Sequence, residues 1–314
     1  MIEDDDGRPR RQRRNEDPSS WPLSARERAA VSRFSEAQSR VPPEFAAAVQ
    51  VTNSEREWIR THLAKFHENK LILDVIGRVK AGKEATVYTC SGHPSTGRAI
   101  IAAKLYRERS LRSSKNTGQY QQGRSLLDAD GNAARSRGSR PAVAPKSKRG
   151  AAATQTSWLM HEFTLLKALH EQGGDVPEPI EHADQALLME FIGDGTNAAP
   201  TLNDVQLDTG EAKRLFERVV FNIELLLGMG WVHGDLSAYN LLYHHGRAVL
   251  IDFPQVVSVE NNPRARSIFE RDVERVVQYF ASVGWSTDHE RLARQLWSKH
   301  VAPAETSAAP PEHE

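Results

Sequence analysis

Residues 233–253 read HGDLSAYNLLYHHGRAVLIDF, and this stretch does most to decide the fold. Two short apolar runs flank a polar turn, which predicts a β-hairpin centred on Gly246. Asn240 and Asp252 are equally far from that centre, so we expect them to be cross-strand neighbours with Cβ atoms about 4.5–5.5 Å apart. An amide oxygen and a carboxylate at that separation can share one hard cation, to which phosphates supply further ligands. The stretch therefore predicts a magnesium site.

The same stretch contains a candidate catalytic carboxylate. Asp235 precedes Asn240 by five residues, and the spacing matches the H-x-D-x-x-x-x-N motif of protein kinases, which is followed by a D-F dipeptide. In a kinase, Asp235 would lie beside the cation and accept the proton of an attacking hydroxyl. The alternative is a polar turn without chemistry. Three short polar residues interrupt apolar runs at the motif spacing, which favours the kinase interpretation.

A glycine-containing segment near the start of the predicted sheet suggests a phosphate-covering flap. Residues 77–84 read GRVKAGKE and nearly fit the P-loop pattern, but Glu84 replaces the hydroxyl that would bind magnesium. The following residues are strand-like, whereas a P-loop opens a helix. We interpret the segment as a strand–turn–strand flap, with Lys83 among the residues that bind the cofactor.

A lysine and a glutamate are predicted to pair beneath this flap. Lys104 ends Ile101-Ala-Ala-Lys104, which resembles the V-A-I-K strand of kinases, whose lysine contacts phosphate oxygens and a carboxylate on the next helix. Glu162 lies on the apolar face of a predicted helix, where a carboxylate is costly to bury unless a cation meets it. The alternative is an edge-strand lysine and an unrelated surface glutamate.

The kinase interpretation also predicts an adenine pocket. The residues expected to enclose the adenine are Val87, Ala102, Met189 and Leu242, and those expected to offer backbone hydrogen bonds run from Glu190 to Ile192. Taken alone, each apolar member is more typical of plain core.

Two histidine pairs raise the question of zinc. His161-Glu162 begins HEFTL, which lacks the second histidine of H-E-x-x-H. His244 and His245 lie at the predicted turn, where adjacent side chains are expected to point apart. We therefore predict no zinc site.

The composition limits the class of protein. Forty-one basic and 41 acidic residues cancel, so no global charge favours nucleic acid, an acidic substrate or a membrane surface. The single cysteine, Cys90, excludes an internal disulfide or a thiolate cluster. Neither a secretory signal nor an apolar run of about 18 residues is present, so we expect no membrane partner and a cytoplasmic location.

The pattern of apolar residues predicts how the chain is divided. We expect a weakly ordered extension at 1–52, an N-lobe of antiparallel strands and helices at 53–192, a helical C-lobe at 193–298 and a disordered tail at 299–314. The N-lobe carries a flexible insert at 107–150, which holds eleven Arg or Lys residues against three acids. That charge suggests RNA or a ribosomal particle as a partner, with a solvated loop as the alternative.

Six segments follow one another in an order typical of one family: GKEA at 82–85, AKLY at 103–106, WLMHE at 158–162, MEFIG at 189–193, HGDLSAYNLLY at 233–243 and IDFPQ at 251–255. Over roughly residues 53–285 the chain resembles the RIO family of atypical serine protein kinases. The resemblance implies an α+β, two-lobed protein-kinase-like fold, with an antiparallel sheet in the N-lobe and a mainly helical C-lobe. It implies ATP and Mg²⁺ as cofactors, with Mn²⁺ as the alternative metal, and a protein substrate or the chain itself as acceptor.

The resemblance also implies roles for single residues. Asp235 corresponds to the catalytic aspartate, Asn240 and Asp252 to the metal ligands, and Lys104 and Glu162 to the pair that anchors phosphates. In this family the metal-binding aspartate can itself receive phosphate, which makes Asp252 a second catalytic candidate. The insert resembles the loop that carries autophosphorylation sites, and its candidates are Ser110, Ser113 and Ser114.

The chain departs from ordinary kinases after Asp252. Pro254 replaces the glycine of D-F-G, and only eleven residues separate Asp252 from Arg264, near the start of the next predicted helix. No ordinary activation segment is therefore expected. No winged-helix pattern precedes Asn53, which favours the RIO branch that lacks this domain.

Three functions remain open at this stage. The first is a RIO-type serine/threonine protein kinase or ATPase, a phosphotransferase that phosphorylates itself. The second is a small-molecule phosphotransferase, because aminoglycoside and choline kinases share HGD-x-x-x-x-N. The third is an ATP-gated RNA or ribosome assembly factor with little kinase activity. The adenine-side motifs and the serines of the insert favour the first.

Overall fold

The computed structural model describes residues 45–46, 48–107, 148–183 and 185–301. Most of the predicted extension, the serines proposed for autophosphorylation and the tail beyond 301 lie outside the described residues. Helix α4 begins at Lys148, within the predicted insert, and helix α7 continues to His300, past the predicted end of the C-lobe. Among the residues described, no helix combines the length and the apolar character needed to cross a bilayer.

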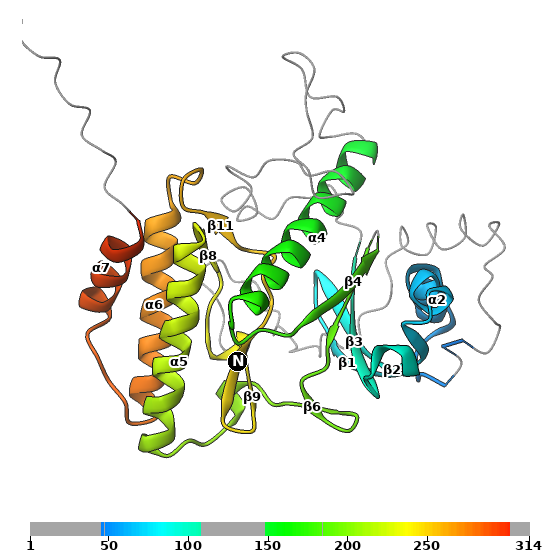
Figure 1. Cartoon of the computed structure of the whole chain (residues 1–314), viewed down its shortest axis with the longest axis horizontal. Coiled ribbons are helices and arrows are strands. Elements are labelled where there is room, and N and C mark those ends of the chain that lie inside the picture. The colour runs from blue at the N-terminus through cyan, green and yellow to red at the C-terminus, as the bar shows by residue number, and fades with distance from the viewer. Residues whose placement is uncertain (1–44, 47, 108–147, 184, 302–314) are drawn as a thin grey trace, which may run out of the picture.

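The N-terminal half is built on a five-stranded antiparallel sheet in the order β1-β2-β3-β5-β4 (Figure 1). Its strands are β1 (Ile72–Ala81), β2 (Ala85–Gly92), β3 (Ile100–Tyr106), β4 (Pro179–Ala183) and β5 (Ala186–Glu190). The sequence pattern predicts strands at 71–79, 85–90, 98–106 and 186–192, which correspond to β1, β2, β3 and β5. It does not predict β4, whose residues are only partly buried and carry no apolar run.

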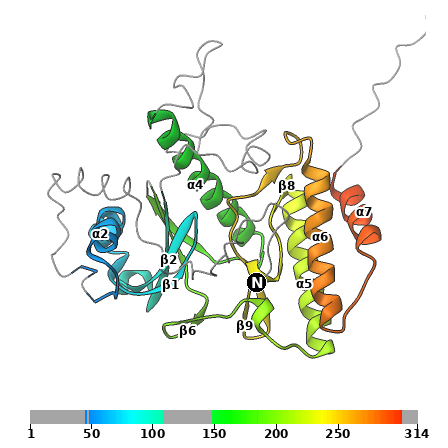
Figure 2. The same cartoon turned by 180° about the vertical axis from the view of Figure 1, so that it is seen from behind.

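Two helices accompany this sheet. Helix α2 (Asn53–Glu68) buries Trp58, Ile59, Leu63 and Phe66, a stripe of helical spacing, in a cluster that also contains Ile101, Ala103 and Leu105 of β3. Because side chains alternate along a strand, Ala102 and Lys104 point to the opposite face. On that side helix α4 (Lys148–Glu171) runs between the sheet and the C-terminal half (Figures 1 and 2).

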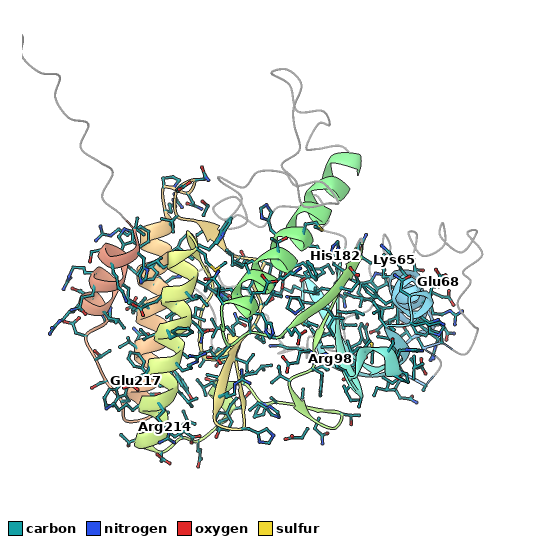
Figure 3. The ribbon with its side chains drawn as sticks, viewed as in Figure 1. Lys65, Glu68, Arg98, His182, Arg214 and Glu217 are labelled. Carbon is teal, nitrogen blue, oxygen red and sulfur yellow. The ribbon has the colours of Figure 1, made fainter. Side chains whose placement is uncertain are left out.

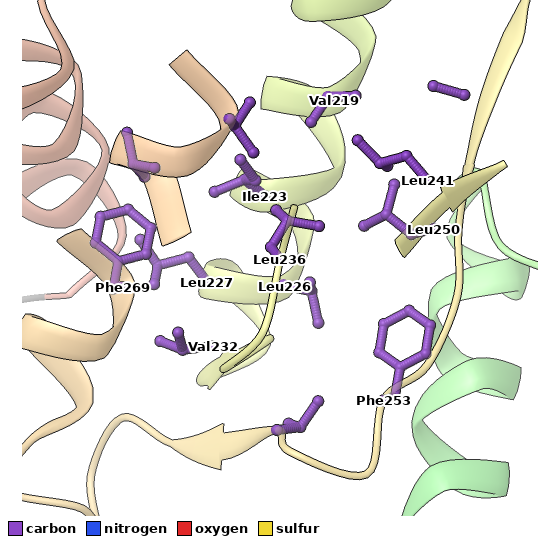
Figure 4. Packing of buried hydrophobic residues seen from close by; sticks show 14 of the residues in the cluster. Val219, Ile223, Leu226, Leu227, Val232, Leu236, Leu241, Leu250, Phe253 and Phe269 are labelled. Atoms are coloured by element: carbon purple, nitrogen blue, oxygen red, sulfur yellow. The ribbon is translucent and has the colours of Figure 1, made fainter. Parts of the chain in front are cut away.

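The C-terminal half is mainly helical. Helices α5 (Thr209–Gly228), α6 (Ala265–Ser282) and α7 (His289–His300) pack side by side (Figure 2). Figure 4 shows α5 contributing Val219, Ile223, Leu226 and Leu227 to a core shared with Phe269 of α6. The opposite side of α5 is polar, and Arg214 and Glu217 lie there (Figure 3).

Short elements connect and line the larger ones. They are the strands β6 (Gly193–Asp194), β7 (Asn197–Ala198), β8 (Trp231–Val232), β9 (Leu241–His244), β10 (Arg247–Leu250) and β11 (Val257–Ser258), and the 3₁₀ turns Pro94–Thr96, Leu202–Asp204 and Ala238–Asn240. The β6–β7 hairpin lies in GDGTNAAP at 193–200, a stretch whose composition predicts only a loop. Three apolar residues of this region, Leu236, Leu241 and Leu250, fix the β9–β10 hairpin to the helical core (Figure 4).

The predicted hairpin forms, but its register differs from the prediction. Leu241 pairs with Leu250, and the Ile251 backbone N–H donates to the Asn240 carbonyl at 3.0 Å. The turn holds two residues, His245 and Gly246, at φ 49° and 73°, rather than three residues centred on Gly246. The expectation that Asn240 and Asp252 are direct cross-strand neighbours is therefore wrong by one residue.

Candidate active site

A cavity of about 730 Å³ lies between the sheet and the helical half. Its walls come from the β1–β2 flap, β3, β5 and the segment after it, the HGD loop, β9 and the segment that begins with Asp252. All the site residues named from the sequence line this one cavity: Lys83, Val87, Ala102, Lys104, Glu162, Met189, Glu190, Ile192, Asp235, Asn240, Leu242 and Asp252. Segments from both halves of the chain thus meet in one place.

Lys104 lies between a buried carboxylate and a half-exposed one. Its Nζ donates to Glu162 Oε1 at 2.8 Å, as predicted, and also to Asp252 Oδ1 at 2.9 Å, which the sequence did not predict. The side chains of Lys104 and Glu162 are only 8% and 3% exposed. Burial alone would lower the pKa of Lys104, but the Asp252 and Glu162 carboxylates outweigh it and raise that pKa well above its ordinary value. Lys104 therefore stays charged.

Tyr106 completes the pairing of Glu162. Its hydroxyl donates to Glu162 Oε2, while Lys104 occupies the other oxygen. Burial, followed by the nearby Glu162 charge, raises the pKa of Tyr106 well above its ordinary value, so the phenol remains a donor. Each oxygen of this buried carboxylate thus has a hydrogen-bond donor, as a charge in this environment requires.

Asp252 is held in an unusual backbone conformation. Its φ is 72°, a left-handed value that is uncommon for residues other than glycine, and it turns the chain out of β10 toward Lys104. The Lys104 ammonium lowers the pKa of Asp252, against the opposite effect of burial. The side chain remains 47% exposed. Asp252 is therefore an ionised carboxylate that one cation already orients and that a second cation can reach.

Asp235 and Asn240 face the cavity from the loop before β9. Asp235 Oδ1 accepts from Arg275 Nη1 at 3.0 Å, and its side chain is 52% exposed. The Asn240 Nδ2 donates to the Asp235 carbonyl at 2.9 Å, which leaves the amide oxygen as the atom that can face a cation. Oxygens of Asn240 and Asp252 are ligands that suit Mg²⁺, which prefers hard donors and keeps several waters. The donor set fits the predicted metal.

His233 supports the loop. One ring nitrogen, Nε2, lies 3.2 Å from the Ile251 carbonyl, and the ring packs against Phe253 with centroids 4.9 Å apart. The residue is buried. Its contacts join the HGD loop to the segment that carries Asp252.

Gly234 lets the HGD loop approach the segment after Asp252. Its φ is +85°, and a Cβ at this position would lie 2.2 Å from the Gln255 carbonyl oxygen. Its N–H donates to Asp272 Oδ2 of α6 at 2.7 Å. The loop is thus packed between α6 and the chain that follows Phe253.

We expect Gly234→Ala to lower the free energy of unfolding by about 2–3 kcal/mol, toward the upper end of the cost of a strained backbone position. Gly230→Ala is the matched control, because Gly230 also has a positive φ, +78°, but nothing lies within 4 Å of its Cβ position. That variant should lose only about 1–2 kcal/mol. Urea unfolding of the two variants measures the difference, and equal losses would contradict the steric explanation.

Comparison with known proteins identifies the family. Residues 86–292 match the RIO domain family. The chain belongs to the RIO family. The RIO-type serine/threonine-protein kinase Rio1 of Thermoplasma acidophilum is 32% identical over 142 residues, which are 45% of this chain and 73% of that protein. The serine/threonine-protein kinase rio1 of Schizosaccharomyces pombe is 30% identical over 223 residues. This match covers 70% of the chain but only 41% of the length of the yeast relative.

A solved structure of a RIO protein has the same fold. It is the Rio2 kinase–ADP/Mg²⁺–phosphoaspartate complex from Chaetomium thermophilum, with a TM-score of 0.53 and 19% identity. The likeness covers 85% of this chain and 74% of that one. The prediction of an α+β kinase-like fold with two lobes is confirmed. Helix α6 begins at Ala265, directly after the short segment that replaces an activation segment.

Proposed function

We propose that this chain is an ATP- and Mg²⁺-dependent RIO-type serine/threonine protein kinase, a phosphotransferase that also phosphorylates itself. The observation that carries the proposal is the position of Lys104 between Glu162 and Asp252, in a cavity that also presents Asp235 and Asn240. This arrangement supplies the groups that phosphoryl transfer needs: a fixed cation, metal-binding oxygens and a carboxylate for the attacking hydroxyl. The names of the relatives support the same activity.

The cavity residues suggest how the nucleotide is held. Lys104 is aimed by two carboxylates and presents its remaining N–H to phosphate oxygens, while the flap with Lys83 lies over them. Asn240 and Asp252 would hold Mg²⁺, which when bound neutralises charge on the transferring phosphoryl group. The adenine would lie between Val87, Ala102, Met189 and Leu242, with backbone partners from Glu190 to Ile192.

We propose Asp235 as the group that takes the proton from a serine hydroxyl. Its carboxylate is open to the cavity and is oriented by Arg275. The serine oxygen would then attack the γ-phosphorus, and the bond from that phosphorus to the β–γ bridging oxygen would break. The electron pair leaves with ADP, and Asp235 holds the proton.

Asp252 is a second candidate acceptor. The Chaetomium thermophilum Rio2 structure is that of a phosphoaspartate complex, and Asp252 is an ionised, half-exposed carboxylate at the phosphate end of the cavity. Attack by its oxygen on the γ-phosphorus would release ADP and leave an acyl phosphate. Water would then hydrolyse this acyl phosphate to inorganic phosphate. This route would make the protein an ATPase.

The test is incubation of the purified chain with γ-labelled ATP and Mg²⁺ in the absence of any other substrate. We expect label on the chain, and we expect EDTA to prevent it. Hydroxylamine cleaves an acyl phosphate but leaves a serine phosphate intact, so it separates the Asp252 acceptor from a serine acceptor. The absence of calorimetric heat with adenine nucleotide and Mg²⁺ would overturn the proposal.

Other partners remain predictions from the sequence. RNA or a ribosomal particle was predicted from the charge of residues 107–150, and residues 108–147 lie outside the described structure. The cytoplasmic location likewise remains a prediction from the sequence.

A further inference from the structure

A second cluster of chemically capable side chains lies outside the kinase cavity. Asp194 ends strand β6, His244 ends strand β9, and His245 forms the turn that follows β9. The Nε2 atoms of His244 and His245 lie 3.3 Å and 3.1 Å from the same atom, Asp194 Oδ1. The two imidazole rings are 4.1 Å apart between centroids. Each of the three residues therefore contributes one potential ligand atom to the same small region.

The expectation that these two histidines point apart is wrong. His245 has φ 49°, the left-handed conformation required by the two-residue turn. This conformation brings its ring back beside that of His244, which is still in the strand. The reason for predicting no zinc from this pair therefore does not hold.

The distances suit a metal ion. Zinc binds imidazole nitrogen and carboxylate oxygen at about 2.0–2.2 Å, so two ligands of a tetrahedral ion lie about 3.3–3.5 Å apart. The two Nε2–Oδ1 distances, 3.3 Å and 3.1 Å, are close to this value. All three ligand atoms lie within 4.8 Å of one another. These separations are short enough for one ion to bind all three residues.

We propose that Asp194, His244 and His245 form a site for one divalent transition-metal ion of the zinc type. Such ions bind imidazole nitrogen readily, whereas Mg²⁺ prefers oxygen ligands. The site therefore differs in chemistry from the predicted magnesium site at Asn240 and Asp252. Three protein ligands leave a fourth position for water. The side chains of Asp194 and His245 are 75% and 72% exposed, so an ion can enter from solvent.

Such an ion would cross-link two neighbouring segments of the cavity wall. Asp194 belongs to the β6–β7 hairpin, and this hairpin leads into Ala199, Pro200 and Thr201 of the cavity wall. The histidines lie at the end of β9, the strand that carries Leu242, and Leu242 forms an antiparallel bridge with Thr201. The two segments already touch, because Tyr243 N donates to the Pro200 carbonyl at 2.9 Å. A metal bound to all three residues would hold the β9–β10 hairpin and the β5–α5 connection together.

The test is titration of the full chain with ZnSO₄ in competition with a chromophoric chelator, in metal-free buffer without nucleotide. We expect one Zn²⁺ per chain and a rise in the thermal unfolding temperature. Asp194→Asn and the double variant H244A/H245A should lose both effects. His289→Ala, which removes an imidazole at the start of α7, should keep them. X-ray absorption at the zinc edge should show two imidazoles and an oxygen ligand.

Three results would overturn the proposal. They are the absence of saturable Zn²⁺ binding to the unaltered chain, equal binding by the unaltered chain and H244A/H245A, and an absorption spectrum without imidazole ligands. Circular dichroism checks that each variant is folded. The zinc site does not include the residues proposed for phosphoryl transfer. We therefore expect H244A/H245A to retain labelling by ATP and Mg²⁺ at low zinc. Loss of zinc binding with labelling intact, or the reverse, therefore separates the two proposals.

Discussion

We expect Asp235→Asn to lower the rate of the proposed phosphoryl transfer by about 10²–10⁴-fold, the usual contribution of a positioned general base. The amide introduced by this substitution can still accept the hydrogen bond from Arg275, which lies 3.0 Å from Asp235 Oδ1. It has no charge with which to take a proton from the attacking hydroxyl. Nucleotide affinity should change little, because in the described structure Lys104 pairs with Glu162 and Asp252 rather than with Asp235. The rate is measured with γ-labelled ATP in a single turnover, and the affinity by calorimetry.

Asp204→Asn is the matched control for this experiment. Asp204 is another carboxylate of the cavity wall, and its Oδ2 accepts from the Thr201 hydroxyl at 2.7 Å. It has no role in the proposed proton transfer, so its replacement should leave the rate within a small factor of that of the unaltered chain. A rate for D235N equal to that for D204N would contradict the role assigned to Asp235.

The Lys104–Glu162 pair could be predicted from the sequence because both charged residues lie within apolar segments. A lysine within an apolar strand and a carboxylate on an apolar helix face each need a partner, and pairing the two satisfies both. The third member, Asp252, was predicted as a metal ligand and a phosphate acceptor but not as a partner of Lys104. Its contact with Lys104 depends on the left-handed φ of 72°, and no sequence pattern here signals that conformation.

Turn length was the weak point of the prediction. Apolar runs indicate where a hairpin lies, but they do not fix the number of residues in its turn. A turn that is one residue shorter shifts every cross-strand partner. The same turn then decided the position of His245. Tyr106 and Arg275 were missed because their partners, Glu162 and Asp235, come from distant elements. The AKLY segment at 103–106 could have suggested Tyr106, which sits two residues after Lys104 on the same face of β3.

Replacing Lys104 with methionine should lower the free energy of unfolding by about 3–5 kcal/mol, the usual cost of leaving one member of a buried ion pair without its partner. Glu162 would keep only the Tyr106 hydroxyl, and its side chain is 3% exposed. Loss of the Lys104–Asp252 pair would contribute less to the fall in the free energy of unfolding, because the Asp252 side chain is 47% exposed. Urea unfolding at neutral pH measures the loss.

Two further variants separate the charge effect from the loss of packing. The double variant K104M/E162Q removes the uncompensated charge, so it should be more stable than K104M alone. Lys299→Met breaks a surface pair, in which Lys299 Nζ lies 2.7 Å from Glu224 Oε1, and should cost about 0–1 kcal/mol. If K104M and K299M lost equal stability, the cluster around Lys104 would not be desolvated as the structure indicates. If the double variant were no more stable than K104M, packing of the lysine stem would account for the loss. A large loss of stability in K104M that E162Q partly reverses is the result expected for a buried charge left without its partner.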